Sequence, residues 1–189
     1  CPSLRSIGTA ATFDNFKVSF TDDFSNSTYT KASWSNPNQM TVNSDSTVTI
    51  AAGKVTSPKD SLTWTNYTME ADVKFTPTDG ALFVGLVGYG QSLNGGNGYE
   101  FGFSKAANST NVQVKLYTRG AGNTNHYPTE QPSFTADTWY HLKMTVDGSH
   151  IRCYIGDTLV IEAENSTFTS GCPSLRSIGT AATFDNFKV

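Results

Sequence analysis

A strict alternation of apolar and polar residues over positions 66–75 constrains the fold of this chain more than any other feature. Every second residue of the segment NYTMEADVKF is apolar: Tyr67, Met69, Ala71, Val73 and Phe75. Successive side chains of a β-strand point to opposite faces, so the pattern predicts a half-buried antiparallel strand. An α-helix of three turns would need an apolar stripe of period 3.6, and the sequence contains none.

Further short apolar segments are separated by Gly- and Asn-rich stretches and are expected to be strands. They cover residues 39–42, 47–51, 81–89, 98–104, 111–118, 139–146, 151–155 and 158–162. Asp147-Gly148 and Gly156-Asp157 are typical of tight hairpin turns. About a dozen strands with turns every 8–12 residues predict an all-β fold, an antiparallel sandwich of two sheets.

The same eighteen residues, CPSLRSIGTAATFDNFKV, occupy positions 1–18 and 172–189, so the two copies begin 171 residues apart. We interpret them as parts of neighbouring tandem repeats; the alternative is an artificial duplication of one segment. Residues 1–18 are then the C-terminal strands of a preceding identical repeat, and residues 19–189 form one complete repeat. No Gly/Ser or Pro spacer separates the two, so a stiff head-to-tail array is expected, in which residues 1–18 pack into a neighbouring copy.

The composition is polar but weakly charged: 15% of residues are charged, 46 are Ser or Thr, and the net charge is −3. Such a surface is common in secreted β proteins and indicates an extracellular or cell-surface location. A basic patch is absent, which argues against nucleic acid as a partner. The sequence has neither an apolar run of membrane-spanning length nor a signal peptide. It is therefore expected to be an interior fragment of a longer secreted chain.

The three cysteines reduce to two per repeat, because Cys1 is the copy of Cys172. Cys153 and Cys172 are 19 residues apart, a loop in which a disulfide contributes about 3 kcal/mol. A disulfide between them is predicted, and the alternative is a pair of buried free thiols. Four Asn-x-Ser/Thr sequons permit glycosylation without indicating it, since chance alone yields a similar number: Asn26, Asn66, Asn108 and Asn165.

Several segments together resemble the concanavalin A-like lectin/glucanase jelly rolls. They are Asp22-Asp23-Phe24 followed by Trp34, the strand SLTWTNYTMEADVKF, the hairpin WYHLKMTVDGSHIRCYIGDTLV and the ending FDNF. The similarity covers residues 19–189 and is greatest to the laminin-G-like branch. That branch includes levan-binding-type carbohydrate modules and a domain of unknown function labelled "family 16 glycoside hydrolase". It implies a jelly roll whose last strand, 183–189, pairs beside the first, 18–24.

The resemblance also implies two kinds of site. Jelly rolls of this kind often hold one structural calcium between the terminal strands, which here implies Asp22 or Asp23 together with Asp185; the alternative is that Asp185 only bonds nearby backbone. Sugar binding is the commonest activity of the family, and flat aromatic faces with a few polar groups suit it. The glycan-binding candidates are Tyr89, Tyr99, Glu100, Tyr117, Arg119 and Tyr127. Each tyrosine could instead be packing in the core.

Catalysis is not expected. The glucanase branch uses a Glu-x-Asp-x-Glu strand, whereas Glu70-Ala71-Asp72 continues as Val73-Lys74 and lacks the second Glu. A solvated strand face explains Glu70 and Asp72. Two functions are then open: a stiff extracellular stalk or filament of linkerless modules, or a glycan-binding module repeated for avidity. The missing spacer and the lack of an Arg near Tyr89 favour the stalk.

Overall fold

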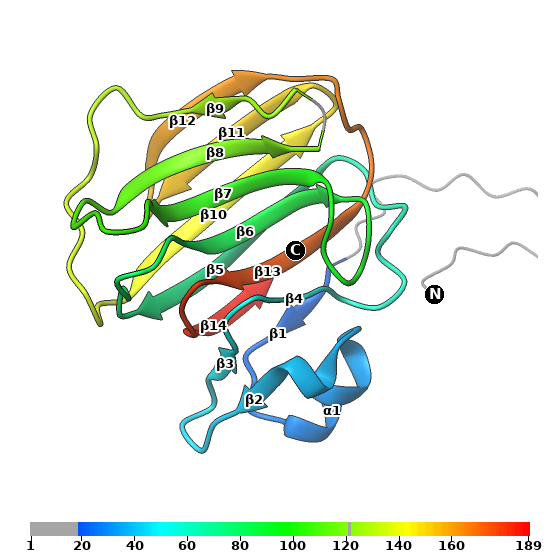
Figure 1. Cartoon of the computed structure of the whole chain (residues 1–189). Coiled ribbons are helices and arrows are strands. Elements are labelled where there is room, and N and C mark those ends of the chain that lie inside the picture. Colours follow the sequence, from blue (N-terminus) through cyan, green and yellow to red (C-terminus); the bar gives the residue numbers. More distant parts are fainter. Residues whose placement is uncertain (1–18, 121) are drawn as a thin grey trace, which may run out of the picture.

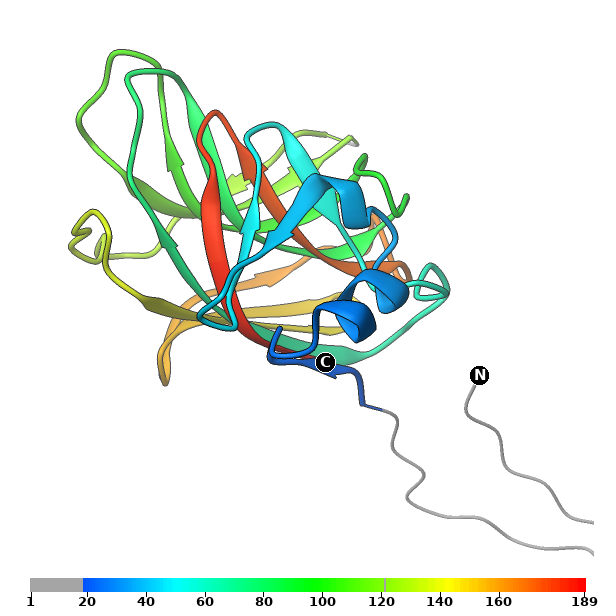
Figure 2. The ribbon, with the colours of Figure 1, turned by 90° about the horizontal axis from the view of Figure 1, so that it is seen from below.

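A computed structural model describes residues 19–120 and 122–189, which form two antiparallel β-sheets packed face to face (Figure 1). One sheet has eight strands in the order β12-β11-β10-β5-β14-β3-β2, with β1 also paired to β14. The other has six, in the order β4-β13-β6-β7-β8-β9. The predicted all-β, two-sheet jelly-roll sandwich is confirmed, and Figure 2 shows the sheets as separate layers.

The elements have the following bounds. The eight-stranded sheet contains β1 (Thr21–Asp22), β2 (Met40–Val42), β3 (Val48–Ile50), β5 (Tyr67–Phe75), β10 (Tyr140–Asp147), β11 (His150–Ile155), β12 (Thr158–Glu164) and β14 (Ala182–Lys188). The six-stranded sheet contains β4 (Lys54–Thr56), β6 (Leu82–Gly90), β7 (Gly98–Lys105), β8 (Gln113–Arg119), β9 (Asn125–His126) and β13 (Cys172–Ile178). A helix α1 (Ser27–Ser33) and a 3-10 turn η1 (Pro37–Gln39) precede β2.

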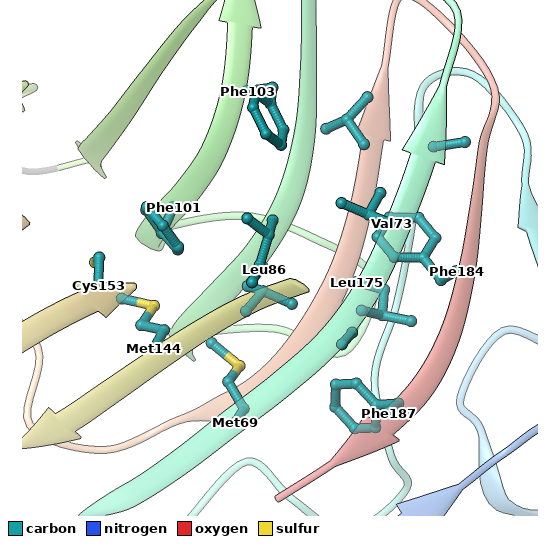
Figure 3. Close-up of a cluster of buried hydrophobic side chains, with 14 of the residues drawn as sticks. Met69, Val73, Leu86, Phe101, Phe103, Met144, Cys153, Leu175, Phe184 and Phe187 are labelled. Carbon is teal, nitrogen blue, oxygen red and sulfur yellow. The ribbon is translucent and has the colours of Figure 1, made fainter. Parts of the chain in front are cut away.

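The alternating segment that carried the strand prediction becomes β5, near the middle of the eight-stranded sheet. Met69, Ala71 and Val73 are fully buried, and β5 pairs with both β10 and β14. Side chains from the two inner faces interdigitate in the core, where Met69 and Met144 approach Leu86 and Phe101 of the opposite sheet (Figure 3). Burial of each such side chain contributes about 1.5–3 kcal/mol before entropy is counted.

The last eighteen residues supply one central strand to each sheet. β13 lies between β4 and β6 in the six-stranded sheet, and β14 lies between β5 and β3 in the other. The predicted pairing of the last strand with the first is confirmed, because Asp22 of β1 is opposite Phe187 of β14. The placement predicted for residues 1–18 lies outside the described residues.

Helix α1 was not expected from the sequence. Asn26 caps its N-terminus by accepting a hydrogen bond from the Tyr29 amide, and the helix ends at the buried Trp34. Trp34 is a core residue, whereas Trp139, which directly precedes β10, is 42% exposed. None of the helices in the described residues has the length and apolar character needed to cross a membrane.

The predicted disulfide between Cys153 and Cys172 is wrong for this structure, in which both are buried free thiols. They lie on different sheets: Cys153 is on β11, opposite Met144, whereas Cys172 begins β13. The Cys172 thiol donates a hydrogen bond to the carbonyl of Gly90, 3.2 Å away, which holds its sulfur against β6. Burial raises the pKa of the Cys153 thiol well above its ordinary value, since a thiolate would be desolvated there.

Candidate functional site

A buried carboxylate on the six-stranded sheet is contacted by two arginines from different strands. Glu100 of β7 has a side chain only 2% exposed, and it accepts hydrogen bonds from Arg119 of β8, at 2.7 Å from Nε to Oε1 and 3.2 Å from Nη2 to Oε2. Nη1 of Arg176, on β13, lies 2.7 Å from the same Oε1. A charge buried this deeply needs such partners, because desolvation alone would disfavour it.

A lysine and a tyrosine extend this group along β8. Nζ of Lys115 lies 5.0 Å from the centroid of the Tyr117 ring, and Cζ of Arg119 lies 5.5 Å from it, so two cations approach one ring. The Tyr117 hydroxyl donates a hydrogen bond to the side chain of Asn123, 2.9 Å away. We call Glu100, Lys115, Arg119 and Arg176 the charged cluster, with Tyr117 as its aromatic neighbour.

The strand register brings the charged cluster to one face. Arg176 pairs with Gly85, Gly85 with Gly102, and Gly102 with Lys115, while Glu100 lies two residues before Gly102 on β7. The intervening residues of β6, β7, β8 and β13 belong to the core. Alternation therefore points the cluster away from the core, onto the outer face of the six-stranded sheet.

Two glycines in this row are required by the close approach of β6 and β7. A Cβ added to Gly85 would lie 2.2 Å from the Phe101 carbonyl oxygen, and one added to Gly102 would lie 2.2 Å from the carbonyl oxygen of Val84. Neither position accepts a side chain without moving the backbone. The row between Arg176 and Lys115 is consequently bare backbone.

The cations of the cluster differ in how strongly they are desolvated. The hydrogen bond to Glu100 raises the pKa of Arg119, whereas burial lowers the pKa of Arg176 and that of Lys115. Both guanidinium groups stay protonated at neutral pH. Two guanidinium groups therefore share one carboxylate, with the Lys115 ammonium over the neighbouring Tyr117 ring, and the arrangement can offer positive charge and N–H donors to a ligand.

The sequence model described as the concanavalin A-like lectin/glucanases superfamily matches residues 49–187, well over half of the chain. This chain belongs to that superfamily. The predicted resemblance is confirmed. No curated protein sequence matches the chain.

Solved structures of the superfamily share the fold. The carbohydrate-binding module CBM66 from Bacillus subtilis is 22% identical, with a TM-score of 0.60 over 75% of this chain and 85% of that one. The Bacillus licheniformis β-glucanase is 15% identical, with a TM-score of 0.62 over 92% and 98%. A prokaryotic β-1,3-1,4-glucanase (lichenase) from a mouse hindgut metagenome is 15% identical, with a TM-score of 0.64 over 91% and 98%. At these identities the likeness shows the fold alone, which binding modules and hydrolases share.

Of the predicted glycan-binding residues, Glu100, Tyr117 and Arg119 come together in the charged cluster. Tyr89 and Tyr99 do not join them, since both are fully buried in the core. Their hydroxyls bond to Asn66 and to the Asn165 region. A stacking role for these two tyrosines is therefore wrong. Tyr127 follows β9 and is 51% exposed.

Lys115 and Arg176 were not predicted as site residues. Lys115 alternates with the predicted Tyr117 and Arg119 along β8, a signal that the strand pattern already contained. Arg176 had no such signal, because only the insertion of β13 beside β6 brings it to Glu100.

The carboxylates tested for catalysis lie on the other sheet. Glu70 and Asp72 project from β5 and are engaged in surface contacts: Lys188 donates to Glu70 at 3.2 Å, and Nδ1 of His141 lies 2.8 Å from Asp72. This agrees with the solvated strand face expected for them. Among the described strands of the six-stranded sheet, Glu100 is the one Asp or Glu residue.

The residues predicted to bind calcium have hydrogen-bond partners of their own in the structure, and calcium binding stays a prediction. Asp22 is buried and accepts hydrogen bonds from the Phe24 amide, the Thr30 hydroxyl and the Trp34 indole, which engage both of its oxygens. Asp23 accepts hydrogen bonds from the amide and the hydroxyl of Ser25. Partial burial raises the pKa of the Asp185 carboxyl group. Residues 19–120 and 122–189 contain no group of three or more His, Cys, Asp or Glu residues placed to hold a metal ion.

The four sequons differ in their surroundings. Asn26 and Asn66 are exposed, and so is Asn108 in the turn between β7 and β8. Asn165 is half-buried, and its Nδ2 donates a hydrogen bond to the Thr118 hydroxyl, 3.1 Å away. A glycan on Asn165 would replace this bond. Occupancy of the four sites stays a prediction.

Proposed function

We propose that this chain is a non-catalytic, extracellular glycan-binding module whose ligand contacts the outer face of the six-stranded sheet. The observation that carries the proposal is the charged cluster. Glu100 holds Arg119 and Arg176 in fixed positions, and both arginine side chains stay partly exposed, 35% for Arg119 and 16% for Arg176. Pre-oriented donors of this kind suit hydroxyl and acid groups of sugars. The likeness to CBM66, a carbohydrate-binding module, supports the proposal.

The distribution of carboxylates supports a binding role over hydrolysis. Glycosidases generally need two carboxyl groups flanking the scissile bond, at about 5–5.5 Å in retaining enzymes and about 6.5–9.5 Å in inverting ones. The described strands of the six-stranded sheet offer only Glu100, and its two oxygens are engaged by Arg119 and Arg176. A carboxylate whose oxygens are both engaged by guanidinium groups is not free to contact a scissile bond.

Binding can be tested by affinity electrophoresis and calorimetry against a panel of neutral and charged polysaccharides. Arg119→Ala removes the donor pair from the proposed face. Arg152→Ala is its matched control, because Arg152 donates to Glu162 at 2.8 Å on the other sheet. Binding lost in the first variant and kept in the second supports the proposal. Equal binding by both variants, or no binding by the unaltered chain, contradicts it.

A second candidate is a tandem array that forms a stiff stalk or filament, and one observation favours it. Residues 1–18 have the sequence of β13 and β14, the central strands that close both sheets. A chain of residues 1–171 keeps one copy of this sequence and lacks its own β13 and β14. The array predicts that such chains complete one another and form open-ended oligomers, which sedimentation velocity would detect. Unfolded or monomeric 1–171 would count against it.

A further inference from the structure

The outer face of the six-stranded sheet carries more positive charge than it neutralises. Arg119 and Arg176 share the single carboxylate of Glu100, and Lys115 has no ion-pair partner among the described residues, which leaves two positive charges uncompensated. The chain as a whole has a net charge of −3. General attraction to polyanions is therefore not expected, and an anionic ligand must be held by a local group of cations.

The hydrogen bonds inside the charged cluster leave one arginine short of acceptors. Glu100 accepts its two aligned hydrogen bonds from Arg119. Nη1 of Arg176 lies 2.7 Å from Oε1 but forms no aligned hydrogen bond with any acceptor of the described residues. A buried N–H group without an acceptor is unfavourable, so Nη1 of Arg176 is held against Glu100 by charge, and a ligand meets the exposed part of this side chain, which is 16% exposed.

The aromatic residue of the face is not free to stack on a sugar ring. The Tyr117 ring has Lys115 and Arg119 within 5.0 and 5.5 Å of its centroid. These side chains come from positions two residues before and after Tyr117 on the same strand, so they flank the ring. Recognition of a neutral sugar through an open aromatic face is disfavoured here, and recognition through cations is favoured.

Two glycines lie between the outer strands that carry the cations. Gly85 and Gly102 occupy the row that joins Arg176 on β13 to Lys115 on β8, three strand steps or roughly 14 Å apart. Neither glycine has a side chain, so the Arg176 side chain can cross β6 and bring its guanidinium to Glu100 on β7.

We propose that the ligand of this face is an anionic glycan, a sugar chain whose carboxylate or sulfate groups are bound by Arg119, Arg176 and Lys115. The inference rests on the proposed function and specifies its ligand class. Guanidinium and ammonium groups form charge-assisted hydrogen bonds with both acid groups. Carboxylated and sulfated glycans would both be bound in this way, and the choice of probe distinguishes them.

The experiment compares probes that differ in charge and share a backbone. Binding of the 189-residue chain is measured by calorimetry to polygalacturonate and to its methyl ester, and to cellulose sulfate and hydroxyethyl cellulose. We expect measurable affinity for one or both acid forms and at least a tenfold weaker affinity for the uncharged partner. Raising NaCl from 50 to 500 mM is expected to weaken only the acid forms, because salt screens exposed charges.

Lys115→Gln tests the face with little risk to folding, since Lys115 is half-exposed and has no ion-pair partner among the described residues. We expect it to weaken binding of the acid form by about threefold to tenfold, and Lys115→Arg to retain it. Lys143→Gln is the matched control, because Lys143 lies 4.5 Å from the Tyr154 ring on the other sheet. Thermal midpoints show whether each variant is folded; should Lys115→Gln unfold, Lys115→Arg and the salt dependence decide.

The outcomes separate the two proposals. Equal affinity for acid and uncharged probes, or equal loss in Lys115→Gln and Lys143→Gln, overturns the anionic ligand. Binding of neutral glycans that depends on Arg119 overturns it too, while the proposed glycan-binding function stands. No binding to any glycan of either charge overturns both.

Discussion

Replacing Asp22 by Asn changes one oxygen of a buried carboxylate into an amide group. Asp22 is 4% exposed and joins β1 to α1, since its Oδ1 accepts from the Phe24 amide at 2.9 Å and the Thr30 hydroxyl at 3.0 Å. Its Oδ2 accepts from the Trp34 indole N–H at 2.8 Å. Asn keeps only one acceptor oxygen, and its NH2 group takes the place of the other. At least one of the three donors then faces this NH2 group instead of an acceptor.

The cost follows from the lost bond and the unpaired donors. A hydrogen bond to a charged group contributes about 1.5–3 kcal/mol, and an unsatisfied buried donor costs about 1–3 kcal/mol. We expect Asp22→Asn to lower the free energy of unfolding by about 2–4 kcal/mol, which for a domain of this size lowers the thermal midpoint by about 4–16 °C.

The neighbouring residue supplies the control. Asp23 is exposed and bonds only to Ser25, so Asp23→Asn is expected to leave the free energy of unfolding nearly unchanged. Urea denaturation followed by circular dichroism and by tryptophan fluorescence measures both variants, with and without EDTA. Equal stability of the two variants refutes the role assigned to Asp22. Destabilisation of both variants that appears only when calcium is present would indicate that Asp22 and Asp23 bind the predicted calcium ion.

Three further predictions concern other parts of the chain. Gly85→Ala is expected to destabilise the fold by about 3 kcal/mol, because its Cβ meets a backbone oxygen at 2.2 Å, whereas Gly80→Ala, whose Cβ is 3.9 Å from any neighbour, is expected to be nearly neutral in urea denaturation. Cys153 and Cys172 should react with a thiol reagent only after unfolding, and non-reducing mass mapping that finds them linked would contradict the structure. The chain should release no reducing sugar from β-glucans; turnover that Glu70→Gln abolishes would show that a catalytic site was overlooked.

The strands were predictable wherever alternation was clear. The segment around Met69 and Val73 has that pattern and became β5, and the hairpin turn at Gly156-Asp157 appears as predicted, since Ile155 pairs with Thr158. The eighteen-residue ending was predicted to form strands, but the bounds of β13 were not predicted, because buried serines interrupt its apolar positions. Helix α1 has only seven residues, too few for an apolar stripe to show.

The site was predictable only in part, because its members come from distant segments. Glu100, Tyr117 and Arg119 lie on paired strands that the sequence indicated. Arg176 joins them through the position of β13 beside β6, which no local pattern determines. The disulfide failed for a similar reason: a count of cysteines gives no distance between them, and here their strands lie in different sheets.

The positions of β13 and β14 have a consequence for the order of folding. Until residues 172–189 have been synthesised, each sheet lacks an inner strand: β4 has no pairing partner, and β2 and β3 are separated from β5. The two gaps are filled by strands whose partners lie far away in sequence, and such pairings form slowly. Before residues 172–189 are in place, the nascent chain therefore exposes unpaired inner edges of both sheets. Aggregation is most favoured at this stage of folding.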